Sequence, residues 1–244
     1  MDTIESPKVD DLIENKIDEI LRRLYEEAEQ HGLVDGGRDY QWGVHVASAR
    51  HVSIDGMWLE FGVYRGRSIC HFAKLTSETI YGFDSFEGLP EKWNDENPKG
   101  VFSLAGKIPD GAIAGSNDQN PGMYSTETNT VMQEWPSNVK LIKGWFDDSL
   151  PLFIEKYKRP VAFLHVDSDI YSSASTILTL LQNQIVPGTV ICFDEMVNYQ
   201  EFREHEIKAF AEFLLRTGYG YKPVVLQDLE YGIATFVITE KENQ

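Results

Sequence analysis

The sequence contains few cysteines, few basic residues and no long apolar segment. Its 244 residues include only two cysteines, Cys70 and Cys192, both in apolar surroundings. We therefore expect reduced core thiols rather than a disulfide, and no metal site built on cysteine. Such cysteine usage is typical of a cytoplasmic protein, which is the localisation we expect.

Positive charge is also scarce. Lysine and arginine number 22 against 39 aspartates and glutamates, so the formal net charge is −17. This balance argues against nucleic acid as a partner and against docking on an anionic membrane surface. No apolar run approaches the roughly 20 residues that span a bilayer, and the acidic, polar start of the chain does not resemble a signal peptide.

What the sequence does contain is an alternation of apolar strands and amphipathic helices. Apolar residues between Val9 and Leu24 recur at helical spacing, and a second helix is expected from Tyr40 to about Val52. Farther along, the expected strands cover residues 57–59, 79–83, 139–142, 161–167, 189–193, 221–226 and 232–239. The expected helices between them cover residues 66–74, 150–157, 172–184 and 201–217.

This alternation is typical of a parallel sheet with helices on both faces, and the last two strands form an antiparallel hairpin. We predict a helical extension over residues 1–52, followed by one α/β domain over residues 53–244. The first helices offer either a homodimer surface or a cover for the chain's own sheet. Residues 88–136 are rich in Gly, Pro, Asn and Ser, which favours a lid or substrate-side insertion, with a disordered insert as the alternative.

The stretch WLEFGVYRGRSI joins a strand to a helix through Gly62 and Gly66, which allow close approach of backbone to a ligand. Glu60 ends this strand, and Asp84 ends the next one, where an acid commonly accepts hydrogen bonds from ribose hydroxyls. Tyr64 stands where a dinucleotide fingerprint needs glycine, and no Walker sequence is present. An adenosine-bearing cofactor without a pyrophosphate fits best, such as S-adenosylmethionine. An ordinary strand–helix turn is the alternative.

Acidic side chains follow two other strands. In FLHVDSDIYSSA, His165, Asp167 and Asp169 alternate, so they share one face of an extended chain. A second strand, in TVICFDEMVN, leads into Asp194 and Glu195, and it should lie beside the first. Converging carboxylates repel unless a cation balances their charge, and all-oxygen ligation suits Mg²⁺ or Ca²⁺. Solvated acids in an acidic protein are the alternative, and His165 is better explained as a core residue.

The stretch LIKGWFDDSLP places two aromatic residues, Trp145 and Phe146, just after another strand. An adenine ring could stack on them at the same edge of the sheet. A role in the core explains Trp145 equally well.

Taken in order, these motifs, YGFDSFEGLPE and FDEMVNY resemble the macrocin O-methyltransferase family over about Trp58 to Phe236. These are class I S-adenosylmethionine-dependent enzymes that methylate hydroxyls of sugars and natural products. The resemblance implies a seven-stranded, Rossmann-like sheet and a divalent cation, usually Mg²⁺. Arrangement of the acids is similar to that in catechol-type O-methyltransferases.

The resemblance also implies roles for individual residues. The residues that would line the methionine end of the cofactor are Glu60, Gly62, Gly66 and Ser68. Asp84 would bind the ribose, Ser85 and Phe86 would contact the adenosine side, and the adenine would contact Trp145, Phe146 and Asp147. The metal would be held by Asp167, Asp194 and Glu195.

Two positions depart from the related patterns. Ile170 stands where several catechol-type enzymes have a lysine or histidine base, and Ala174 replaces an expected threonine. The general base therefore cannot be transferred. Asp167 is the first candidate for proton acceptor, with Asp169 and His165 in reserve.

The expected reaction is methyl transfer to a hydroxyl of a small-molecule acceptor. Two alternatives remain at this point: an NAD-dependent or nucleotide-sugar oxidoreductase, and a non-catalytic binding protein with the same fold.

Overall fold

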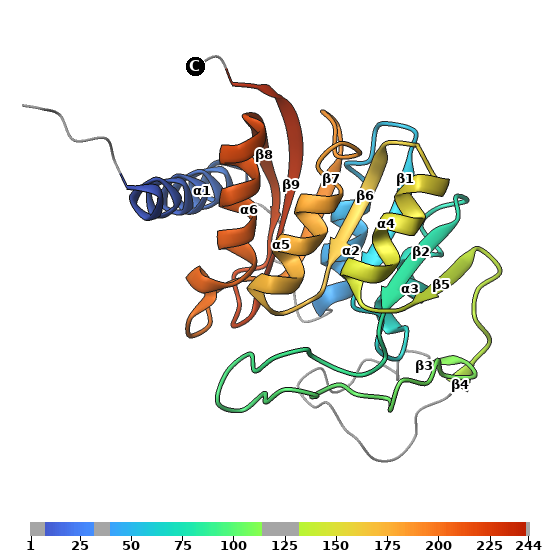
Figure 1. Cartoon of the computed structure of the whole chain (residues 1–244). Helices are drawn as coiled ribbons and strands as arrows, with labels where there is room; N and C mark the ends of the chain where they lie inside the picture. The colour runs from blue at the N-terminus through green and yellow to red at the C-terminus, as the bar shows by residue number, and fades with distance from the viewer. Residues whose placement is uncertain (1–7, 32–39, 114–131, 243–244) are drawn as a thin grey trace, which may run out of the picture.

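A mainly parallel seven-stranded sheet organises the chain (Figure 1). The computed structural model describes residues 8–31, 40–113 and 132–242. In spatial order the strands are β5 (Val139–Lys143), β2 (Ile80–Asp84), β1 (Met57–Phe61), β6 (Val161–Val166), β7 (Val190–Val197), β9 (Gly232–Lys241) and β8 (Tyr219–Leu226). The first five run parallel, and β9 is antiparallel to both β7 and β8. The predicted α/β class and the antiparallel C-terminal strands are confirmed.

Helices cover both faces of this sheet. On one face lie α4 (Phe146–Lys156), α5 (Tyr171–Leu180) and α6 (Glu206–Thr217), and α1 (Val9–His31) packs beside α6 and β8. On the other face lie α2 (Tyr40–Ala49) and α3 (Arg67–Phe72). Every residue of β1, β6 and β7 is buried, as expected for central strands covered on both sides.

Several element boundaries differ from the sequence prediction by a few residues; α5, for example, ends at Leu180 rather than 184. Helix α4 begins at Phe146 rather than 150, and a short 3-10 turn, η1 (Phe202–Glu204), precedes α6. Strand β7 continues past Phe193 to Val197, because its pairing with β9 resumes there after an irregularity. Asp194 and Glu195 therefore lie within the irregular part of the strand rather than beyond its end.

The insertion contains two short antiparallel strands that the sequence did not predict, β3 (Ala112–Ile113) and β4 (Met132–Gln133). The described part of the insertion lies below the sheet in Figure 1, at the edge where β2 ends. Glu91 accepts a hydrogen bond from the Ser172 hydroxyl at 2.6 Å, and the Trp93 ring contacts Tyr199 at a centroid distance of 5.7 Å. Residues 114–131 of the predicted lid lie outside the described residues, so the lid stays a prediction.

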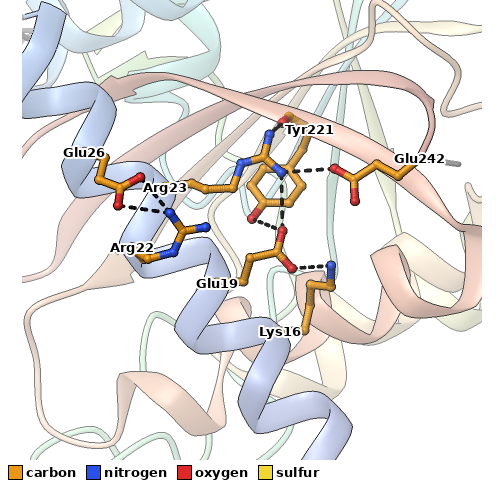
Figure 2. A network of polar contacts seen from close by, with 7 residues as sticks. All are labelled: Lys16, Glu19, Arg22, Arg23, Glu26, Tyr221 and Glu242. Atoms are coloured by element: carbon orange, nitrogen blue, oxygen red, sulfur yellow. Dashed lines mark hydrogen bonds and ion pairs between the residues drawn. The ribbon is translucent and has the colours of Figure 1, made fainter. Parts of the chain in front are cut away.

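Helix α1 is joined to the sheet by an apolar stripe and a polar network. The stripe consists of Ile13, Ile17, Ile20 and Leu24. The Arg23 guanidinium lies 4.1 Å from the centre of the Tyr221 ring and forms ion pairs with Glu19 and Glu242, which Figure 2 draws as dashed lines. The stripe thus packs on the chain's own fold, and the homodimer remains a prediction. Within the described ranges, no helix combines the length and apolar character needed to cross a membrane.

We expect Ile20→Ala to lower the free energy of unfolding by about 2–4 kcal/mol, because Ile20 is fully buried and the smaller side chain leaves a cavity. Leu12→Ala on the same helix is the control, since Leu12 is 41% exposed and should change stability by less than about 0.5 kcal/mol. Urea denaturation of both variants measures the difference. Equal effects would contradict the packing of α1 on α6 and β8.

Candidate active site

The carboxyl ends of β1, β2 and β6 meet through backbone hydrogen bonds. The Gly62 N–H donates to the Phe83 carbonyl at 3.0 Å, and the Asp167 N–H donates to the Phe61 carbonyl at 2.9 Å. Parallel strands thus bring the glycine turn, the acid of β2 and the acids after β6 to one edge, as the sequence predicts.

Gly62 occupies a position where a side chain would not fit. Its φ of +93° lies in the left-handed region, and a Cβ atom there would lie 1.6 Å from the Asp167 carbonyl oxygen. The backbone after β1 therefore passes directly against the backbone of a candidate metal ligand.

The Asp84 carboxylate holds the glycine turn in place. Its Oδ2 accepts the N–H groups of Val63 at 2.9 Å and Tyr64 at 2.6 Å, and its Oδ1 accepts the Phe86 N–H at 2.6 Å. A carboxylate has about four acceptor positions, so three are used by the protein. The remaining capacity is compatible with a ribose hydroxyl.

Glu60 lies fully buried behind the turn. Its Oε1 accepts a hydrogen bond from the Ser68 hydroxyl at 2.9 Å, and its Oε2 lies 3.2 Å from Nδ1 of His165. Burial raises the pKa of Glu60, whereas His165 and Ser68 counteract that rise. Ser68, Glu60 and His165 thus form a continuous polar chain beneath the turn.

His165 continues this chain to Asp194. Its Nε2 lies 3.6 Å from Oδ1 of Asp194, and Nε2 of His45 on α2 lies at the same distance from that oxygen. Burial alone would lower the pKa of His165, but Asp194 and Glu60 raise it well above its usual value. Burial alone would raise the pKa of the Asp194 carboxyl, but His165 and His45 hold that pKa below its usual range. Asp194 is therefore the anionic member of the group.

Three carboxylates converge beside this pair of histidines. Asp167, Asp194 and Glu195 each place one oxygen within 4.8 Å of the others. Burial and the charge of Asp194 raise the pKa of both Asp167 and Glu195 well above their usual values. Among the described residues, Oε2 of Glu195 is buried without a hydrogen-bond partner. Oxygen ligands with uncompensated negative charge fit a hard divalent cation.

Two further buried acids, Asp169 and Glu206, lie near the three converging carboxylates. Asp169 has a left-handed backbone, with φ of +63°, and burial together with the charge of Asp194 raises its pKa to about 7. Glu206, at the start of α6, is fully buried, and burial with the charges of Asp169 and Asp194 raises its pKa to about 8. A buried acidic cluster with a strained backbone residue is the pattern of a functional site.

A comparison with known protein families agrees with this geometry. The model of the macrocin-O-methyltransferase (TylF) family matches residues 30–213, most of the chain. The chain belongs to this family.

Individual relatives and solved structures share low sequence identity with this chain. Mycinamicin III 3''-O-methyltransferase of Micromonospora griseorubida is 26% identical over 164 residues, which cover 62% of this chain and 59% of that protein. The chain thus matches less than two thirds of that relative's length. Two solved structures share the fold. The calicheamicin methyltransferase CalS11 has a TM-score of 0.57 at 18% identity, with 96% of this chain and 93% of that chain covered. The O-methyltransferase NovP has a TM-score of 0.56 at 16% identity, with 93% and 99% covered.

In this macrocin-O-methyltransferase family member, the three residues predicted to contact the adenine differ from one another in solvent exposure. Trp145 is half-buried at the N-cap of α4, and Asp147 in the first turn is exposed. Phe146 packs edge-on against Phe61 at a centroid distance of 5.2 Å. Trp145 thus keeps a partly exposed ring at the edge of the sheet, whereas Phe146 also contributes to the core.

The remaining predicted residues lie near the turn. Gly66 is the N-cap of α3, and the Ser85 hydroxyl accepts the Glu87 N–H at 3.0 Å. Phe86 is only 1% exposed and packs in the core. The contact of Phe86 with the adenosine side of the cofactor stays a prediction.

Two residues of the site were not identified from sequence. His45 gave no usable signal, because nothing in the sequence around it indicates that α2 lies near Asp194. For Glu206 the sequence did contain a signal. Glu206 shares a helical face with Phe210 and Phe213, and a charged residue on an apolar helical face is unusual.

We expect Gly62→Ala to destabilise the protein more than Gly218→Ala does. Both glycines have positive φ, but only at position 62 would the new methyl group collide with backbone, since nothing lies within 4 Å of a Cβ at Gly218. Gly218→Ala therefore reports the backbone cost alone, about 1–2 kcal/mol. Thermal and urea unfolding compare the two. Equal losses would show that the approach of Gly62 to Asp167 is not a tight constraint.

Proposed function

We propose that the chain is an S-adenosylmethionine-dependent O-methyltransferase that uses a divalent cation and acts on a hydroxyl of a sugar or natural-product-like small molecule. Three observations support this proposal. The chain belongs to the macrocin-O-methyltransferase family, its glycine turn lies between Glu60 and Asp84, and three carboxylates converge beside that turn. The converging carboxylates carry the argument for the cation.

The cation would be held by Asp167, Asp194 and Glu195. Mg²⁺ is the first choice, because it binds carboxylate oxygens and keeps positions for water or substrate. A bound divalent cation would lower the pKa of an acceptor hydroxyl and help to fix its position. His45 and His165 would orient Asp194, since both direct Nε2 toward its Oδ1.

We choose among the candidate proton acceptors by the solvent exposure of their side chains. Asp167 is partly exposed, whereas Asp169 is 7% exposed and His165 is fully buried. His165 also directs its two ring nitrogens at Glu60 and Asp194. Asp167 is therefore the preferred proton acceptor and Asp169 the second candidate. The contacts of His165 favour a positioning role instead.

The cofactor would lie across the glycine turn. Glu60 and Ser68, with Gly62 and Gly66, would line its methionine end, Asp84 and Ser85 its ribose side, and Trp145 its adenine. Methyl transfer requires the acceptor oxygen in line with the methyl group and the sulfonium, so positioning supplies much of the rate. The insertion at residues 88–136 would close over the acceptor and exclude water.

The oxidoreductase alternative is disfavoured by Tyr64, which replaces a glycine of the dinucleotide fingerprint, and by the family match. A non-catalytic role is tested by methyl incorporation from labelled S-adenosylmethionine into small-molecule extracts. Labelled product is expected, and its absence across sugar-containing acceptors would contradict the proposal.

We further propose a cytoplasmic protein without nucleic-acid or membrane partners, with a homodimer as a possible assembly.

We expect Glu195→Gln, or excess EDTA, to lower turnover by at least about 100-fold while leaving affinity for S-adenosylhomocysteine within about twofold, because the metal ligands do not line the cofactor. Glu195 suits this test better than Asp194, whose replacement would leave two buried histidines without their anion. Turnover and isothermal titration measure the two effects. Full activity in EDTA would contradict a role for the cation.

We expect Trp145→Ala to weaken binding of S-adenosylhomocysteine about tenfold, because stacking of an aromatic ring contributes about 1 kcal/mol or more beyond burial. Leu152→Ala on the same helix is the control, since Leu152 is 70% exposed. Isothermal titration gives both affinities, and NAD should not bind the wild-type protein. Tight NAD binding would favour the oxidoreductase.

A further inference from the structure

Glu206 is a buried acid whose hydrogen bonds, within the described part of the chain, come from the backbone of the two segments that carry the candidate metal ligands. It is the first residue of α6 and is completely buried. The helix directs the neighbouring Ile207, Phe210 and Phe213 into the core. An acid on this face therefore needs a specific explanation, because an apolar residue would be cheaper to bury.

The two carboxylate oxygens of Glu206 contact different segments. Oε1 accepts the N–H of Ser168 at 3.4 Å, and Oε2 accepts the N–H of Glu195 at 3.3 Å. Ser168 lies between Asp167 and Asp169, directly after β6. Glu195 lies in the irregular part of β7, where the strand has left its pairing with β9.

The site needs such a connection, because its geometry depends on two segments that sheet pairing does not hold together at this point. The pairing of β6 with β7 ends at Val166 and Phe193, one residue before Asp167 and Asp194. Beyond that point Glu206 supplies a hydrogen-bond acceptor to each segment.

We propose that Glu206 is a positioning residue for the cation site: by accepting one backbone N–H from each segment, it fixes the separation of Asp167 and Glu195. This inference depends on the proposed function, because it assumes that these carboxylates bind a divalent cation. Groups that orient metal ligands commonly affect affinity by 10–100-fold without contacting the ion.

The test uses the full chain, with Mn²⁺ as the probe for the cation site. We expect Glu206→Ala to weaken Mn²⁺ binding about 100-fold and Glu206→Gln about tenfold, since the amide keeps one oxygen acceptor but turns its NH₂ toward the other N–H. Electron paramagnetic resonance of free Mn²⁺ measures this affinity. Affinity for S-adenosylhomocysteine, measured by isothermal titration, should stay within about twofold in both variants.

Glu212→Gln is the matched control. Glu212 lies on the same helix and accepts the Tyr171 hydroxyl at 3.0 and 2.8 Å, so its replacement disturbs α6 without touching the cation site. Mn²⁺ affinity should be unchanged in this variant, even if its stability falls. A similar loss in Glu212→Gln and Glu206→Gln would show a general effect of helix packing and would overturn the inference.

Two results separate this inference from the proposed function. If wild type binds Mn²⁺ and Glu206→Ala binds it equally well, the inference is wrong and the proposed cation site stands. If wild type binds S-adenosylhomocysteine but no Mn²⁺, the cation site and the inference both fall. If Glu206→Ala does not fold, the isosteric Glu206→Gln decides, and an unchanged Mn²⁺ affinity there overturns the inference.

Discussion

Compensation of buried negative charge at the ends of β6 and β7 is the constraint on which the site depends. Asp167, Asp194 and Glu195 bring oxygens together within 4.8 Å, in surroundings that disfavour charge. Two buried histidines compensate one of these acids, Asp194, and so keep it anionic. The cation that we propose would balance the charge of the other two, and this would explain why the fold retains a cluster that is costly to bury.

The residues proposed to bind the cofactor and those proposed to bind the cation are physically connected. The polar chain from Ser68 through Glu60 and His165 to Asp194 passes through the core between them. On the other side, Gly62 passes against the backbone of Asp167, so a shift of the turn would move this candidate ligand. Close backbone packing and buried hydrogen bonds therefore set one geometry for both parts of the site.

The fold places these groups by strand order. Because β1 lies between β2 and β6, and β7 follows β6, four strand ends deliver their polar residues to one edge. The antiparallel pair β8 and β9 completes the sheet on the other side, and α1 covers it there (Figure 1). The described part of the insertion lies at the carboxyl edge, where Trp93 packs with Tyr199 close to the acids.

The class of the fold and the main acids of the candidate site could be predicted from the amino-acid sequence alone. Alternating apolar runs and helical stripes are local patterns, and acids such as Asp84 and Asp167 stand at the ends of such runs, so both could be read without coordinates. Only the tertiary structure decided the roles of His45 and Glu206, since these depend on which helices pack behind the strand ends. It also decided that β7 continues to Val197 through an irregularity, because that follows from pairing with β9, a contact between segments distant in sequence.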